Sequence, residues 1–112
     1  MNNTVILITS NGMGKSDERL GQTLAGKYFE LLSQNGSLPA VLCFYTEGVK
    51  LVCDDSPILD QLRKLESNGV RLIVCSTCLN YYELNENVQV GIVGGMGDIL
   101  EAQVKADKVI TI

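Results

Sequence analysis

Residues 70–78 read Val70-Arg71-Leu72-Ile73-Val74-Cys75-Ser76-Thr77-Cys78, a short apolar run followed by two cysteines. A continuous, partly β-branched run of this kind is typical of a strand that is buried on both faces of a parallel sheet. Ligands of open α/β sheets bind outside the carboxyl ends of the strands. The segment therefore predicts an α/β fold in which Cys75 ends a strand and is accessible at the rim of the sheet, with a second thiol within reach.

Strand-like and helix-like segments alternate along the rest of the chain. Apolar runs predict further strands at residues 5–9, 40–44, 88–93 and 109–112, with helices between most of them. Such alternation implies parallel pairing with right-handed crossovers. The expected fold is a three-layer α/β/α sandwich with a mostly parallel, five-stranded sheet, and the pattern leaves the strand order open.

The boundaries of the expected helices follow from capping residues and glycines. Ser16 can cap the first helix, which ends at Asn35-Gly36 and is expected to place one apolar face on the sheet, made of Leu20, Leu24, Tyr28, Leu31 and Leu32. The second helix begins at Ser56-Pro57 and ends at Asn68-Gly69. The third covers residues 98–105 after a flexible glycine-rich turn at 94–97, and residues 45–48 are expected to form a loop.

Length and composition restrict the class of protein. At 112 residues, 46% of them hydrophobic, the chain is expected to form a single domain, residues 1–112. A net charge of -4 without a basic cluster argues against a nucleic-acid partner, and the lack of histidine removes the commonest zinc ligand. The apolar runs are too short for a membrane span or a signal-peptide core, so we expect no membrane association and a cytoplasmic location with reduced cysteines.

A glycine-rich loop follows the first expected strand. A P-loop requires a glycine where Thr9 stands, and a dinucleotide-binding turn requires one where Asp17 stands, so nucleotide binding is not predicted. A glycine-rich bend that opens a helix is nevertheless receptive to anions. Gly12, Gly14 and Lys15 are therefore candidates for holding a small anion or a persulfide.

The four cysteines fall into two groups. Cys43 lies within an apolar strand and Cys53 precedes two aspartates, so both are expected to be structural. The spacing of Cys75 and Cys78 permits a disulfide or a relay of sulfur between thiols, and a helix after Cys75 would stabilise a thiolate. One such pair supplies only about two of the roughly four ligands that zinc needs, so neither a metal nor a cofactor is predicted. Two incidental thiols in a turn are the structural alternative.

The cysteine segment also carries a family resemblance. Residues 75–84, Cys-Ser-Thr-Cys-Leu-Asn-Tyr-Tyr-Glu-Leu, resemble the signature of DsrE-like sulfur-transfer domains. They are closest to the C-terminal domain of YedF-type proteins, which are described as sulfurtransferase-like selenium metabolism proteins. Weaker similarity extends over residues 12–21, 38–51 and 106–110.

The resemblance implies a single DsrE-like domain with a known type of site. In this family a cysteine at the end of the third core strand accepts sulfur and passes it on as a persulfide, and Cys75 matches that place. Cys78 matches the additional cysteine of the YedF-type motif. The resemblance also implies a homo-oligomer, either a trimer or a hexamer, and a sulfur donor or acceptor protein as partner, for which a TusA-like protein is a candidate.

Three functional hypotheses remain open on the sequence. The first is a sulfurtransferase-like persulfide carrier that uses Cys75 with Cys78 and handles sulfur or selenium, with turnover as an enzyme left open. The second is a thiol–disulfide redox protein, and the third is a non-catalytic subunit or binding module. Besides the loop residues above, the candidates for shaping the pocket are Tyr45, Thr77, Asn80 and Tyr81.

Overall fold

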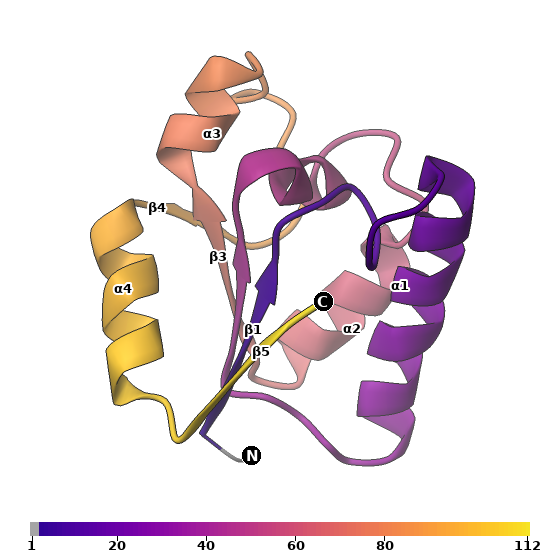
Figure 1. Cartoon of the computed structure of the whole chain (residues 1–112), viewed down its shortest axis with the longest axis vertical. Coiled ribbons are helices and arrows are strands. Elements are labelled where there is room, and N and C mark those ends of the chain that lie inside the picture. The colour runs from indigo at the N-terminus through magenta and orange to yellow at the C-terminus, as the bar shows by residue number, and fades with distance from the viewer. Residues whose placement is uncertain (1–2) are drawn as a thin grey trace.

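The computed structural model describes residues 3–112 and contains a five-stranded parallel sheet with the strand order β4-β3-β2-β1-β5 (Figure 1). The elements in chain order are β1 (Thr4–Ile8), α1 (Glu18–Gln34), β2 (Val41–Phe44), the 3-10 helix η1 (Thr46–Val52), α2 (Leu59–Ser67), β3 (Arg71–Cys75), α3 (Ser76–Tyr81), β4 (Ile92–Gly94), α4 (Met96–Lys105) and β5 (Lys108–Thr111). The predicted α/β class and parallel pairing are confirmed.

Three layers surround a core centred on β1, β2 and β3. Helices α1 and α2 cover one side of the sheet and α4 lies on the other, whereas α3 and η1 project beyond its carboxyl edge (Figure 1). The residues of β1 and β2 are buried throughout, as parallel strands covered on both faces require. The two edge strands, β4 and β5, are largely exposed.

The start of α1 differs from the prediction. Asp17 rather than Ser16 is the N-cap, and its carboxylate accepts hydrogen bonds from the backbone N–H groups of Arg19 at 2.9 Å and Leu20 at 3.4 Å. The Ser16 hydroxyl instead donates to the Asp17 carbonyl oxygen. Both residue types are good caps, so the sequence did not distinguish them.

The predicted inner face of α1 is also wrong in part. Leu20, Leu24 and Leu31 are 41–51% exposed, and the buried residues of the helix are Gly21, Ala25, Gly26 and Phe29. Small side chains let the helix lie close to its neighbours: the Met13 N–H donates to the Gly21 carbonyl at 2.8 Å, and Gly26 lies beside Ile58. The buried face of α1 is therefore formed mainly by small residues that let the helix backbone approach its neighbours, and not by the predicted leucines.

Helix boundaries change between β2 and β3. Residues 45–48, expected as a loop, include the beginning of η1, four residues of which are buried. Helix α2 begins at Leu59, after Pro57 in a preceding turn, rather than at Ser56-Pro57.

The chain from 88 to 97 also differs from the prediction. β4 covers only Ile92–Gly94, whereas Val88 forms an isolated antiparallel bridge with Cys53. The segment 94–97 is not a flexible turn, because Gly94 ends β4 and α4 begins at Met96. The Asp98 carboxylate accepts a hydrogen bond from the Gly95 N–H at 2.9 Å, which stabilises this earlier helix start.

Within residues 3–112, none of the helices combines the length and the apolar character that crossing a membrane requires.

Candidate functional site

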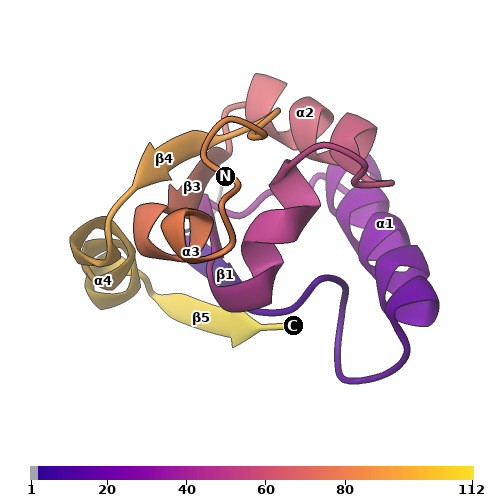
Figure 2. The same ribbon diagram turned by 90° about the horizontal axis from the view of Figure 1, so that it is seen from above.

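The candidate site lies where η1 and α3 meet above the carboxyl edge of the sheet (Figure 2). β2 and β3 are hydrogen-bonded neighbours, and η1 follows β2 just as α3 follows β3. The two short helices therefore lie side by side. This brings residues 46–52 of η1 next to the cysteine segment.

Cys75 is the last residue of β3 and is only 1% exposed. Side chains alternate along a strand, so Cys75 shares a sheet face with Ile73, and α4 packs against this strand. Among the described residues, no backbone N–H donates to the Cys75 sulfur. The expectation that Cys75 is accessible at the rim is therefore wrong: it is buried at the end of β3, paired with Gly94 of β4.

Cys78 is the more accessible thiol of the pair. It lies in the first turn of α3 and is partly exposed. The backbone N–H of Thr46 donates to its sulfur at 3.0 Å, and Cys75 lies close enough to influence its ionisation. The structure thus brings the two thiols together and leaves Cys78 on the outside.

The surroundings of Cys78 influence its ionisation in opposite directions. Burial and the hydrogen bond with Cys75 raise the pKa of the Cys78 thiol, whereas the Thr46 N–H lowers it, and the balance is a raised pKa. The resting side chain is therefore a thiol at neutral pH. The Thr46 N–H is the contact that favours the thiolate.

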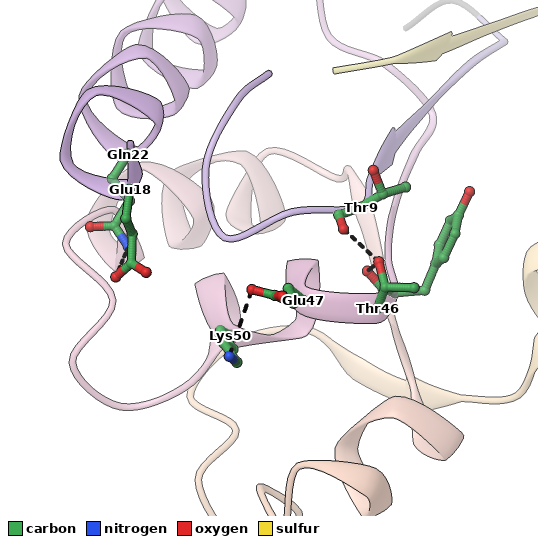
Figure 3. Close-up of polar contacts among 7 residues, drawn as sticks. Thr9, Glu18, Gln22, Thr46, Glu47 and Lys50 are labelled. Atoms are coloured by element: carbon green, nitrogen blue, oxygen red, sulfur yellow. Dashed lines mark hydrogen bonds and ion pairs between the residues drawn. The ribbon is translucent and has the colours of Figure 1, made fainter. Parts of the chain in front are cut away.

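Thr46 has an unusual backbone for its residue type. Its φ is 48°, in the left-handed region that β-branched residues rarely adopt. Its hydroxyl lies within hydrogen-bonding distance of the carbonyl oxygens of Thr9 and Tyr45, and Figure 3 shows the bond to Thr9 at the end of β1. The hydroxyl therefore ties the first residue of η1 to the rim of the sheet.

A cavity of about 430 Å³ is lined in part by Lys50 of η1 and by Tyr82, which follows α3, but by neither Cys75 nor Cys78. The Lys50 ammonium is 4.6 Å from the centre of the Tyr82 ring. It is also 3.8 Å from the Glu47 carboxylate, an ion pair drawn in Figure 3. Tyr82 follows Cys78 by one helical turn. Asp54, Asp55 and Glu18 also line this cavity, so the charged side chains on its wall are acidic apart from Lys50.

The predicted loop residues lie apart from the cysteines. Gly12 and Gly14 line a separate cavity of about 140 Å³ between the β1–α1 loop and η1. Gly12 is buried against the backbone of Gly21, whereas Gly14 and Lys15 are exposed. In the part of the chain that the structure describes, Lys15 makes no ion pair and no hydrogen bond to either cysteine.

The other predicted pocket residues lie around the two short helices. Tyr45 is partly buried directly before Thr46, and Thr77 is exposed between the two cysteines. Asn80 accepts a hydrogen bond from the Asn85 side chain at 2.6 Å. Tyr81 is 81% exposed and packs edge-on against Tyr82, with ring centres 5.2 Å apart.

The remaining cysteines are buried, in line with a structural role. Cys43 lies in the middle of β2, and burial raises its pKa to about 11. Cys53 donates to the Val49 carbonyl at 3.2 Å. Among residues 3–112, no group of three or more acidic or cysteine side chains is arranged to hold a metal ion.

The sequence did not indicate two residues of this region: Thr46, which contacts Cys78, and Lys50, which lines the cavity beside Tyr82. Thr46 and Lys50 reach the site through η1, which was expected to begin as a loop. No local sequence signal marks a threonine for a left-handed backbone, because that conformation is set by contacts with β1 and α3.

Comparison with known proteins supports the fold. The model of the DsrE/DsrF-like family matches residues 4–112, whereas no curated protein matches the chain. The YchN protein from E. coli is a similar solved structure, with 17% sequence identity and a TM-score of 0.70 over 100% of both chains. MTH1491 from Methanobacterium thermoautotrophicum has 22% identity and a TM-score of 0.69 over 97% of both chains. BT1422 from Bacteroides thetaiotaomicron has 14% identity and a TM-score of 0.71 over 98% of this chain and 95% of its own. The last two are titled as proteins of unknown function.

Proposed function

The chain belongs to the DsrE/DsrF-like family, and from this premise we propose that it is a cytoplasmic sulfur carrier that holds sulfur as a persulfide on the Cys75–Cys78 pair. The observation that carries the proposal is the paired thiols: Cys78 is partly exposed, lies beside the buried Cys75 and receives the Thr46 N–H at 3.0 Å. A thiol that can be approached, with a second thiol behind it, suits the acceptance and release of sulfur.

The burial of Cys75 favours Cys78 as the first acceptor, the reverse of the order suggested by the family resemblance. The Cys78 thiolate attacks the terminal sulfur of a donor persulfide, R–S–SH. A bond forms between Cys78 Sγ and that sulfur, the donor S–S bond breaks, and the donor leaves as a thiolate that takes a proton from solvent. The product is Cys78–S–SH.

The stored sulfur has two possible exits. An acceptor thiolate can attack the terminal sulfur and carry it away, which regenerates the Cys78 thiolate. Alternatively, the Cys75 thiolate attacks Cys78 Sγ, hydrosulfide leaves, and the Cys75–Cys78 disulfide remains until a dithiol supplies two electrons. The second exit uses the same pair as the thiol–disulfide redox hypothesis.

Intact mass analysis after incubation with glutathione persulfide tests the proposal. The wild-type chain should gain the mass of one sulfur, and Cys78→Ala should not. Cys43→Ala is a matched control that removes a buried thiol from β2 and should keep the adduct. Cys75→Ala should hold the adduct longer because the resolving thiol is missing.

The outcomes of this experiment separate the hypotheses. A wild-type chain that gains no sulfur rejects the carrier role, and formation of the disulfide alone favours the redox protein. An adduct that survives in Cys78→Ala but not in Cys75→Ala assigns the first step to Cys75. A parallel incubation with a selenium-bearing donor distinguishes the cargo by mass.

The proposed homo-oligomer has a candidate surface on α4. Met96, Leu100 and Val104 are exposed on this helix, and Ile92 is exposed on the adjacent strand β4. We propose that a second copy of the chain covers them. Light scattering should show a trimer or hexamer for the wild type and a smaller species for Leu100→Glu, whereas Leu24→Glu, on the opposite side of the sheet, is the control. A monomeric wild type would contradict the oligomer.

A further inference from the structure

We propose that Thr46 is a positioning residue: its hydroxyl anchors the junction of β2 and η1 so that the Thr46 N–H stays against Cys78 Sγ, where it stabilises the thiolate both when sulfur is accepted and when it is released. The inference rests on the proposed function for the sulfur chemistry. The positioning itself rests on geometry alone, because the N–H donates to the sulfur at 3.0 Å across 32 positions of the chain.

The backbone of Thr46 needs support from its surroundings. A φ of 48° is unfavourable for a β-branched residue and persists only where neighbouring contacts enforce it. The hydroxyl provides such a contact, because its single proton lies within reach of the carbonyl oxygens of Thr9 and Tyr45. Tyr45 is itself fixed, because its N–H donates to the Ile8 carbonyl at 3.1 Å and its carbonyl accepts from the Gly48 N–H at 3.0 Å.

The direction of the N–H makes this arrangement functional. The amide belongs to the peptide unit between Tyr45 and Thr46. Its direction is therefore set by Tyr45, which is extended (φ -146°, ψ 173°) and held by its hydrogen bonds to Ile8 and Gly48, while the left-handed turn at Thr46 starts η1 after it. Among the described residues, Thr46 supplies the one backbone N–H that reaches the Cys78 sulfur. A hydrogen bond to an ionised acceptor is stronger than one to a neutral acceptor, so the contact favours the thiolate over the thiol. It thereby opposes burial and Cys75, which favour the thiol.

The same contact serves both halves of the transfer. During acceptance, the Cys78 thiolate is the nucleophile and the N–H increases its population. During release to an acceptor, the bond between Cys78 Sγ and the stored sulfur breaks, and the electron pair remains on Cys78 Sγ. Negative charge then develops at the atom toward which the Thr46 N–H already points, as at a preorganised oxyanion site.

The test compares three side chains by the pH dependence of Cys78 alkylation with iodoacetamide, read by peptide mass mapping. Thr46→Ser keeps the hydroxyl and should retain the wild-type profile. Thr46→Ala loses the hydrogen bond that the hydroxyl donates, so the midpoint for Cys78 should move up by about one to two pH units. Alkylation at fixed neutral pH should then be about 10- to 100-fold slower. A profile for Thr46→Ala that superimposes on the wild type overturns the inference.

A second variant keeps the proposal testable if Thr46→Ala does not fold. Replacing the peptide bond between Tyr45 and Thr46 by an ester, through incorporation of the α-hydroxy acid analogue, removes the N–H and keeps the side chain. The same upward shift is expected, and an unchanged midpoint in the folded ester overturns the inference. Failure of the sulfur-carrier role is distinguishable, since a wild type that accepts no sulfur can still show the midpoint shift.

Discussion

Gly48 lies so close to Ile8 that a Cβ atom on Gly48 would stand 2.0 Å from the Ile8 carbonyl oxygen. This contact seats η1 directly on the end of β1, two residues after Thr46. The carbonyl oxygen belongs to the sheet backbone and cannot move aside without disturbing β1. The position of Thr46, and through it the hydrogen bond to Cys78, therefore depends on the absence of a side chain at residue 48.

Gly48→Ala is expected to destabilise the chain by about 3 kcal/mol or more, because overpacking against rigid backbone forces η1 away from the sheet. Urea unfolding measures the change. Gly97→Ala is the matched control, since a Cβ atom there meets nothing within 4 Å and the residue lies in α4. That variant should be neutral or slightly stabilising. Equal stability of Gly48→Ala and wild type would contradict the close packing of η1.

The N-cap of α1 can be tested by comparing the unfolding free energies of two variants, Asp17→Ala and Ser16→Ala. Asp17→Ala removes a carboxylate that accepts two backbone hydrogen bonds and should cost about 1 kcal/mol of unfolding free energy. Ser16→Ala removes a hydroxyl that bonds only to the adjacent carbonyl and should cost much less. Thermal or urea unfolding of the two variants side by side decides the matter. A larger loss for Ser16→Ala would restore the cap predicted from sequence.

The sequence pattern predicted β3 correctly but did not predict the strand order or the buried face of α1. The run before Cys75 predicted β3 because continuous burial in a parallel sheet leaves a local signature. The strand order left no such trace, since any right-handed crossover is compatible with the same alternation. On α1, the leucines suggested a face that the small residues Gly21 and Ala25 occupy instead, because close approach has no hydrophobic signature.

The site was predictable to the extent that it is local. Cys75 and Cys78 are three positions apart, so a strand followed by a short helix was sufficient to bring them together. The burial of Cys75 was not predictable from its local sequence, because β4, which pairs with it at Gly94, and α4, which packs against β3, come later in the chain. The Thr46–Cys78 contact joins segments 32 positions apart and depends on a backbone conformation that threonine does not favour.

Cys43 provides a prediction about alkaline stability. Burial raises its pKa from 9.0 to about 11, an effect that Arg71 partly opposes. A raised pKa in the folded state means that the unfolded chain loses its proton first, so stability is full below about pH 9 and falls as the pH rises toward about 11. The expected loss from this thiol is about 2 to 3 kcal/mol. Urea unfolding as a function of pH should show a smaller loss for Cys43→Ala than for wild type, and parallel curves would contradict the assignment.

Cys75→Ala is expected to make Cys78 more reactive at neutral pH. Cys75 raises the pKa of Cys78 as a hydrogen-bond partner and as a neighbouring charge, so its removal lowers that pKa, although burial continues to raise it. The reaction of Cys78 with iodoacetamide near pH 7 should therefore be roughly three- to tenfold faster than in the wild type. Ile73→Val is the control for packing, since it deletes a methyl group from the same face of β3 without touching the thiol pair. This change in the pKa of Cys78 is opposite to the one expected for Thr46→Ala. The two variants therefore distinguish Cys75, which favours the thiol, from the Thr46 N–H, which favours the thiolate. If Cys75→Ala slowed alkylation while Ile73→Val did not, the two sulfurs would not be coupled as the structure arranges them.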